Sequence, residues 1–195
     1  MKKGLALVAL SIIGVFTIVS CSRRVTRIAT NEQIDISGRW NDTDARLSAE
    51  ALSSQIVMGD WINEYQAKTG KKPTVIVGLV RNKSHEHIDA ELFTVEVEKA
   101  LVKYQKAKVV QGGEMRNELR AERADQQTNS SVSTMKKFGL ELGADFMLQG
   151  TINSVVDALK KQKVVYYQVD LTLTNIQTNE KVWYGDKKIK KYIKN

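Results

Sequence analysis

The stretch Val164-Val165-Tyr166-Tyr167-Gln168-Val169-Asp170-Leu171-Thr172-Leu173-Thr174 decides the fold of this chain. Apolar side chains occupy every second position, which is the pattern of a β-strand with one buried face and one solvent-facing face. The turn-forming sequence Thr178-Asn179-Glu180 follows and leads into another predicted strand over residues 181–189. The two segments therefore predict an antiparallel hairpin.

Upstream of this hairpin, strand patterns alternate with helix patterns. Strands are predicted over residues 74–80, 108–111 and 146–152, and helices over 41–70 with a bend or break at Gly59, 89–105, 114–127 and 132–142. Helix 114–127 has few apolar side chains, so we expect it on the surface. This order predicts an α+β fold, close to an α/β sandwich, with a mixed sheet of about four to five strands flanked by about four helices.

The first 20 residues have the features of a secretory signal, with Lys2 and Lys3 ahead of an apolar run over residues 5–19. The run ends in Ile18-Val19-Ser20-Cys21, which resembles the cleavage box of bacterial lipoproteins, whose cysteine is lipidated. A run of about 15 apolar residues is short for a transmembrane helix. Cys21 is the only cysteine, so it has no partner for an internal disulfide or a zinc site.

These features predict three parts: a signal peptide over residues 1–20, the lipidated Cys21 with a short tether over 21–38, and a globular domain over 39–195. The resemblance to lipoproteins also implies a location. Ser22 stands where aspartate often marks retention in the inner membrane, which favours the outer membrane with the domain facing the periplasm.

The charge is basic, with 30 Lys and Arg against 22 Asp and Glu, and therefore +8 at pH 7. Nucleic acid is an unsuitable partner for an exported protein, so we expect none. Lipid headgroups, cell-wall polymers or an acidic protein surface are possible anionic neighbours. A solvated basic surface that keeps the protein soluble explains the same charge.

Motifs for catalysis or metal binding are incomplete. His85 and His87 form an H-x-H pair around Glu86, but no further ligand stands at a useful spacing, so we predict a polar loop and no metal. Ser133-Thr134-Met135-Lys136 matches S-x-x-K without the companion motifs of that enzyme class. We therefore expect no enzyme activity and no cofactor.

Three segments together resemble the LpoB family, the outer-membrane lipoprotein activators of bifunctional penicillin-binding proteins. They are Ser37-Gly38-Arg39-Trp40-Asn41-Asp42-Thr43-Asp44, then Leu142-Gly143-Ala144-Asp145-Phe146-Met147-Leu148-Gln149-Gly150, and finally residues 169–175 with 178–183. The second and third segments are also similar to the curli-secretion lipoprotein and to the amino-terminal domain of TolB. The resemblance implies a monomeric domain that binds and activates a bifunctional penicillin-binding protein in peptidoglycan synthesis.

The partner-binding surface has to be sought among exposed segments. We rank the loop with Arg81, Asn82, Lys83, His85 and His87 first, because function concentrates on loops held by a rigid scaffold. Helix 114–127 and the basic tail at 187–191 are the other candidates. Two alternative functions remain open: an envelope-anchored binding domain with another partner, or an export component like the curli-secretion lipoprotein. The latter requires hairpins with strands of about 9–11 residues, and only 164–174 is predicted to be that long.

Overall fold

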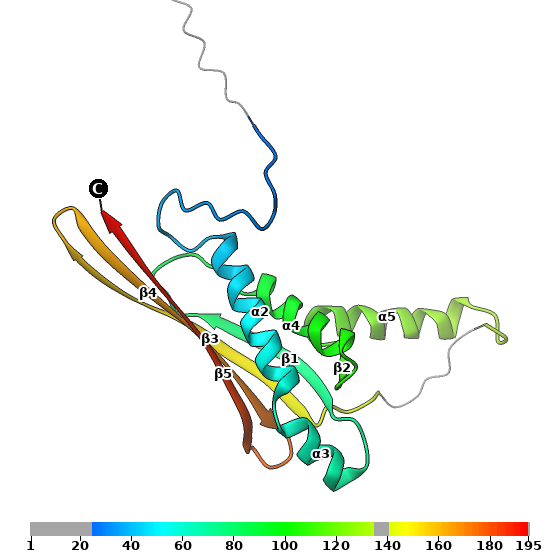
Figure 1. Ribbon diagram of the computed structural model, residues 1–195. Coiled ribbons are helices and arrows are strands. Elements are labelled where there is room, and N and C mark those ends of the chain that lie inside the picture. Colours follow the sequence, from blue (N-terminus) through cyan, green and yellow to red (C-terminus); the bar gives the residue numbers. More distant parts are fainter. Residues whose placement is uncertain (1–24, 135–140, 195) are drawn as a thin grey trace, which may run out of the picture. The chain divides into compact units, whose positions relative to one another are not determined.

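The computed structural model describes residues 25–134 and 141–194. Its helices and strands follow the order α2 (Asp42–Met58), α3 (Trp61–Thr69), β1 (Thr74–Asn82), α4 (Glu91–Lys103), β2 (Lys108–Val110), α5 (Gly113–Asn129), β3 (Phe146–Leu159), β4 (Gln162–Asn175) and β5 (Lys181–Lys194) (Figure 1). The strands form one mixed sheet in the order β2-β1-β3-β4-β5. Strand β1 runs parallel to β2 and β3, while β3, β4 and β5 are antiparallel. The predicted α+β class and mixed sheet are confirmed.

The three carboxyl-terminal strands are longer than predicted. Each has 14 residues, so the predicted ends of the first strand at residue 152 and of the last at residue 189 are wrong. The residues added at the ends of β3 and β5 lie on paired strands, where backbone hydrogen bonds hold them although most of their side chains are exposed. Strand length therefore does not argue against the export alternative.

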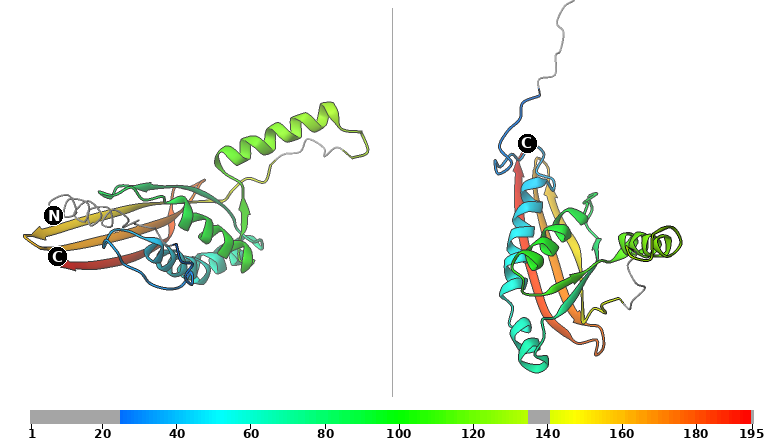
Figure 2. Two further views of the ribbon diagram at one scale, coloured as in Figure 1. Left: turned by 90° about the horizontal axis from the view of Figure 1, so that it is seen from above. Right: turned by 90° about the vertical axis from the view of Figure 1, so that its right-hand side faces the viewer.

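Helices α2, α3 and α4 cover one face of the sheet (Figure 2). Gly59 separates α2 from α3, as predicted, and Gly70 ends α3 in the left-handed conformation. Side chains from α2, α3, α4 and the inner face of the sheet form the core: Leu52, Ile56, Trp61, Val75, Phe93, Val97, Leu101, Phe146, Leu148, Ile152, Val165, Tyr167, Val169, Leu171 and Leu173. The predicted alternation of β4 is thereby confirmed, because the odd-numbered residues from 165 to 173 are buried and the even-numbered ones are not.

Helix α5 differs from the other helices because none of its residues is buried. It extends away from the sheet, so three rather than about four of the described helices flank the sheet (Figures 1 and 2). The prediction of a surface helix is confirmed. Of the helix predicted over 132–142, residues 135–140 lie outside the described residues; residues 132–134 form a turn and 141–144 are irregular, so the predicted ends are wrong.

The chain divides into two compact units, residues 1–32 and residues 33–195. Residues 33–38, which the sequence assigns to the tether, therefore belong to the unit that contains the sheet. Among residues 25–134 and 141–194, no helix combines the length and hydropathy that crossing a bilayer requires.

Candidate functional site

The five residues predicted to bind a partner lie at the end of β1 and in the loop that follows it. Arg81 and Asn82 are the last residues of β1, and Asn82 pairs with Ile152 of β3. Lys83, His85 and His87 follow in the loop, and all five residues are exposed. The loop is therefore accessible and is attached to the sheet at its first residues.

Asn82 gives the loop its conformation. Its side-chain Oδ1 accepts a hydrogen bond from the Ser84 N–H at 2.9 Å, and its Nδ2 donates to the Glu86 carbonyl oxygen at 2.7 Å. A short side chain that bonds backbone groups two and four residues ahead stabilises a turn. Asn82 thus organises the loop from within.

His85 fastens the loop to β3 and β4. Its backbone N–H donates to Ser154 Oγ at 3.0 Å, and its ring Nδ1 lies 2.6 Å from the same oxygen. The imidazole stacks on Tyr167, with 6.3 Å between ring centroids, and its Nε2 is 3.2 Å from Glu86 Oε1. Asn82 and His85 therefore hold the loop, while Arg81 and Lys83 give it exposed positive charge and His87 is exposed beside them.

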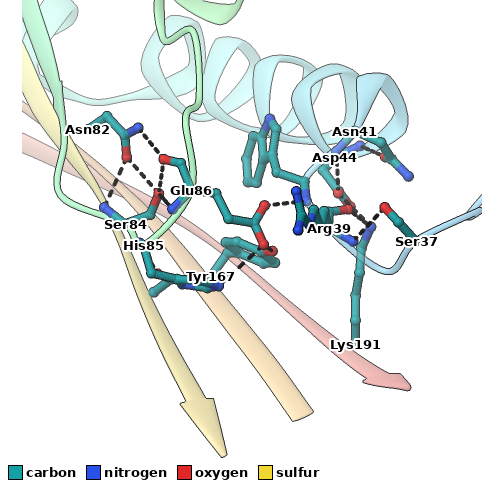
Figure 3. Close-up of polar contacts among 12 residues, drawn as sticks. Ser37, Arg39, Asn41, Asp44, Asn82, Ser84, His85, Glu86, Tyr167 and Lys191 are labelled. Atoms are coloured by element: carbon teal, nitrogen blue, oxygen red, sulfur yellow. Dashed lines mark hydrogen bonds and ion pairs between the residues drawn. The ribbon is translucent and has the colours of Figure 1, made fainter. Parts of the chain in front are cut away.

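Glu86 lies at the centre of this arrangement, although no sequence pattern marks it as a candidate (Figure 3). Its side chain is only 11% exposed and accepts hydrogen bonds from the Trp40 N–H at 2.9 Å and the Tyr167 hydroxyl at 2.8 Å. Burial raises the pKa of Glu86, but these two hydrogen bonds and the nearby His85 outweigh burial and leave the pKa below its ordinary value of 4.5. A buried carboxylate thus joins the loop, β4 and the segment before α2.

The segment that precedes α2 is held in place by side chains of the motif over residues 37–44. Trp40 packs edge-on against Tyr167 with 5.4 Å between ring centroids. Asn41 caps α2 by accepting the Asp44 N–H at 3.1 Å, while Asp44 accepts the Asn41 N–H at 3.0 Å. This reciprocal capping gives the motif a structural role at the start of α2.

Lys191 of the basic tail turns inward. Its Nζ lies 2.6 Å from Asp44 Oδ2, 2.8 Å from Asp35 Oδ1 and 2.9 Å from the Arg39 carbonyl oxygen. Burial lowers the pKa of Lys191, but hydrogen bonds to the two carboxylates raise it above its ordinary value. The pKa of Asp35 falls to about 2, because of hydrogen bonds from Gln33 and Lys191. This lysine of the predicted contact tail therefore stabilises the fold.

Sequence patterns could not select Glu86, Tyr167 or Lys191 as one cluster. Tyr167 alternates like any core residue of β4, and it lies 81 positions from Glu86 along the chain. The one local signal is the His85-Glu86-His87 triplet, in which Glu86 stands between two histidines. Within the ranges that the structure describes, no group of three or more His, Cys, Asp or Glu side chains is placed to hold a metal ion.

The comparison with protein-family models finds a match over most of the chain. A sequence model for "Peptidoglycan-synthase activator LpoB" matches residues 44–189. Among solved structures, the LpoB carboxyl-terminal domain from Salmonella enterica is similar, with 18% identity, a TM-score of 0.41, and 75% of this chain and 98% of that chain covered. The corresponding domain from Escherichia coli has 19% identity and a TM-score of 0.35, with 67% and 98% covered.

Lipoprotein GNA1162 from Neisseria meningitidis is also similar, with 14% identity, a TM-score of 0.39, and 62% of this chain and 83% of that chain covered. No curated protein matches the chain in sequence.

Proposed function

Because the chain belongs to the LpoB family of peptidoglycan-synthase activators, whose members are not catalytic, we propose that it binds and activates a bifunctional penicillin-binding protein. The observation that carries this proposal is the family match over residues 44–189, which includes α2 to α5 and most of the sheet. Two activities of such a synthase, polymerisation and cross-linking, are the steps that binding would accelerate.

Activation by a protein without a catalytic site requires a difference in affinity between two states of the synthase. A ligand shifts a conformational equilibrium only by the difference in its binding free energy to the two states, typically about 1–3 kcal/mol. A factor of about 5–150 in the population of the active state follows from that range. The domain therefore needs a rigid contact surface that fits one state better.

The loop after β1 is our proposed contact surface. Arg81, Lys83 and His87 are exposed there, and the hydrogen bonds of Asn82 and His85 hold the backbone beneath them. A loop ordered before binding loses less conformational entropy on association, which favours affinity. The positive charges of Arg81 and Lys83 favour an acidic surface on the synthase, in keeping with charge complementarity at interfaces.

We further propose that Cys21 carries the lipid that anchors the protein in the outer membrane, facing the periplasm. The segment from Cys21 to Asp35, where contacts with the sheet begin, spans at most about 50 Å when fully extended. This short reach requires a partner that extends a domain toward the outer membrane.

The test is a purified bifunctional synthase from the same organism, assayed on lipid-linked precursor with and without the full-length protein in detergent. We expect both synthase rates to rise. Arg81→Glu with Lys83→Glu should abolish the increase, whereas Lys71→Glu with Lys72→Glu, in the exposed turn before β1, should preserve it. Unchanged rates with every bifunctional synthase of the organism would refute the activator function.

A further inference from the structure

The hairpin of β3 and β4, together with the end of β5, extends beyond the helices (Figure 1). We call its last part the hairpin tip. It comprises the turn Lys160-Lys161 and the outward-facing residues of three paired rows: Val155, Tyr166 and Lys190; Asp157, Val164 and Tyr192; Leu159, Gln162 and Lys194. These residues face away from the core because their neighbours along each strand, such as Val165, face the core.

Apolar and aromatic side chains form the centre of the hairpin tip. Leu159 is 73% exposed, Val155 is 64% exposed and Tyr192 is 61% exposed. Val164 and Tyr166 lie between them on β4. Large apolar side chains gathered on one exposed face indicate an interaction site, because such groups are normally scattered singly over a soluble surface.

Lysines surround this centre. The tip has one acidic residue, Asp157, and four exposed lysines, namely Lys160, Lys161, Lys190 and Lys194. Among the described residues, none of these four lysines takes part in an ion pair. The tip therefore presents positive charge that the rest of the described domain does not neutralise.

The chain that leads to Cys21 leaves the domain close to this tip. Asp35 pairs with Lys191, which lies opposite Val165, and Gly38 packs against Ile193. The row of Val165 lies three residues from the end of β4 at the turn, which is a distance of about 10 Å along the strand. Thirteen residues lie between Cys21 and Asp35, so a lipid on Cys21 and the tip can reach the same bilayer.

We propose that the hairpin tip binds the surface of an anionic phospholipid bilayer, namely the bilayer that holds the anchor. Tyrosine favours the interface between headgroups and acyl chains, and lysine stems cover apolar surface while their charged ends stay in water. Lysines near anionic lipid add electrostatic attraction. The proposal rests on the lipid anchor proposed above, which brings the domain to the bilayer, but not on activation of a synthase. Its consequence is a fixed orientation of the domain at the membrane.

The experiment uses the full-length lipoprotein with bimane attached at Gln162→Cys, reconstituted into vesicles that contain lipids with a spin-labelled headgroup. The matched control carries the label at Gln149→Cys, another exposed glutamine on the same outer face but far along β3 from the turn. We expect quenching of the Gln162 label in phosphatidylcholine vesicles with a quarter of phosphatidylglycerol. The Gln149 label should stay bright, as should both labels on phosphatidylcholine alone.

Charge reversal gives the second arm of the experiment. Lys160→Glu with Lys161→Glu should lower the quenching at Gln162 by at least about fivefold. The equal charge change of Lys71→Glu with Lys72→Glu, at the opposite end of the sheet (Figure 1), should leave it unchanged. Circular dichroism of each variant confirms that the fold is intact.

Three results would overturn the proposal: no quenching at Gln162 on anionic vesicles, equal quenching on neutral vesicles, or full quenching after reversal of the turn lysines. If only an added synthase shields the Gln162 label, the tip is a protein interface and the membrane proposal is wrong. If bimane labels the unmutated chain, Cys21 is free of lipid and the proposal fails with the anchor. Activation of the synthase is decided separately by its own assay.

Discussion

Replacing Tyr167 with phenylalanine tests whether the buried Glu86 cluster holds the domain together. Tyr167 is fully buried, and its hydroxyl donates to Glu86 Oε1 at 2.8 Å. The substitution removes one oxygen atom and leaves the ring against Trp40. It therefore isolates the hydrogen bond from the packing of the aromatic ring.

The expected cost follows from the charge and burial of the acceptor. A hydrogen bond to a charged group contributes about 1.5–3 kcal/mol, and Glu86 would keep the Trp40 N–H as its other donor. We expect the free energy of unfolding to fall by about 2 kcal/mol. For a domain of this size that corresponds to a decrease in Tm of roughly 4–8 °C.

The effect should depend on pH in a defined direction. The pKa of Glu86 is below its ordinary value in the folded protein, so its charged form stabilises the fold above the unfolded pKa. That contribution is lost as the pH falls through the folded pKa. Because Tyr167→Phe removes a donor that favours the carboxylate, its cost should shrink in acid.

Urea unfolding followed by circular dichroism measures these free energies. Tyr166→Phe is the matched control, since Tyr166 lies on the opposite face and its hydroxyl donates to the uncharged Gln168; we expect a change within about 0.5 kcal/mol. In a Glu86→Gln background the cost of Tyr167→Phe should fall by about half. An equal cost with Glu86 or glutamine, or no cost at all, would show that the charge of Glu86 is irrelevant.

Three further predictions concern other parts of the chain. Lys191→Met should destabilise the domain by about 2–4 kcal/mol in urea unfolding, because it leaves the buried carboxylate of Asp44 without its ion-pair partner. Lys188→Met, at an exposed lysine, should leave the free energy of unfolding nearly unchanged. Gly150→Ala should cost at least about 1–3 kcal/mol, since a Cβ would collide with a carbonyl oxygen of β4, whereas Gly143→Ala meets no neighbouring atom and should be neutral in the same assay. Cys21→Ala should abolish fatty-acid labelling of the protein in cells, and label retained on the variant would refute the lipid anchor.

Local patterns predicted the types and order of the elements well. The alternation of residues 165–173 identified β4 and its buried face, and Gly59 and Gly70 marked a break and an end of helices. The ends of β3 and β5 were missed because their last residues are paired rather than buried. Hydropathy reports burial, whereas a strand continues wherever a neighbouring strand supplies hydrogen bonds.

The candidate site was predictable only in part. The exposed loop with Arg81 and Lys83 could be found from its composition, since polar residues between a strand and a helix predict an accessible connection. The sequence could not show which residues of the loop hold it in place and which are left for a partner. The hydrogen bonds of His85 to Ser154, which hold the loop, join positions 69 residues apart.

By itself, the sequence determined the periodicities of the helices and strands and the glycines that divide and end helices α2 and α3, because each depends on residues that are neighbours along the chain. It also carried the family resemblance over most of the domain. Only the tertiary structure decided that Glu86 meets Trp40 and Tyr167, that Lys191 turns inward, and that apolar and basic side chains meet at the hairpin tip. Those contacts depend on the register of three strands and the docking of a loop, and register is a property of paired strands rather than of any one segment.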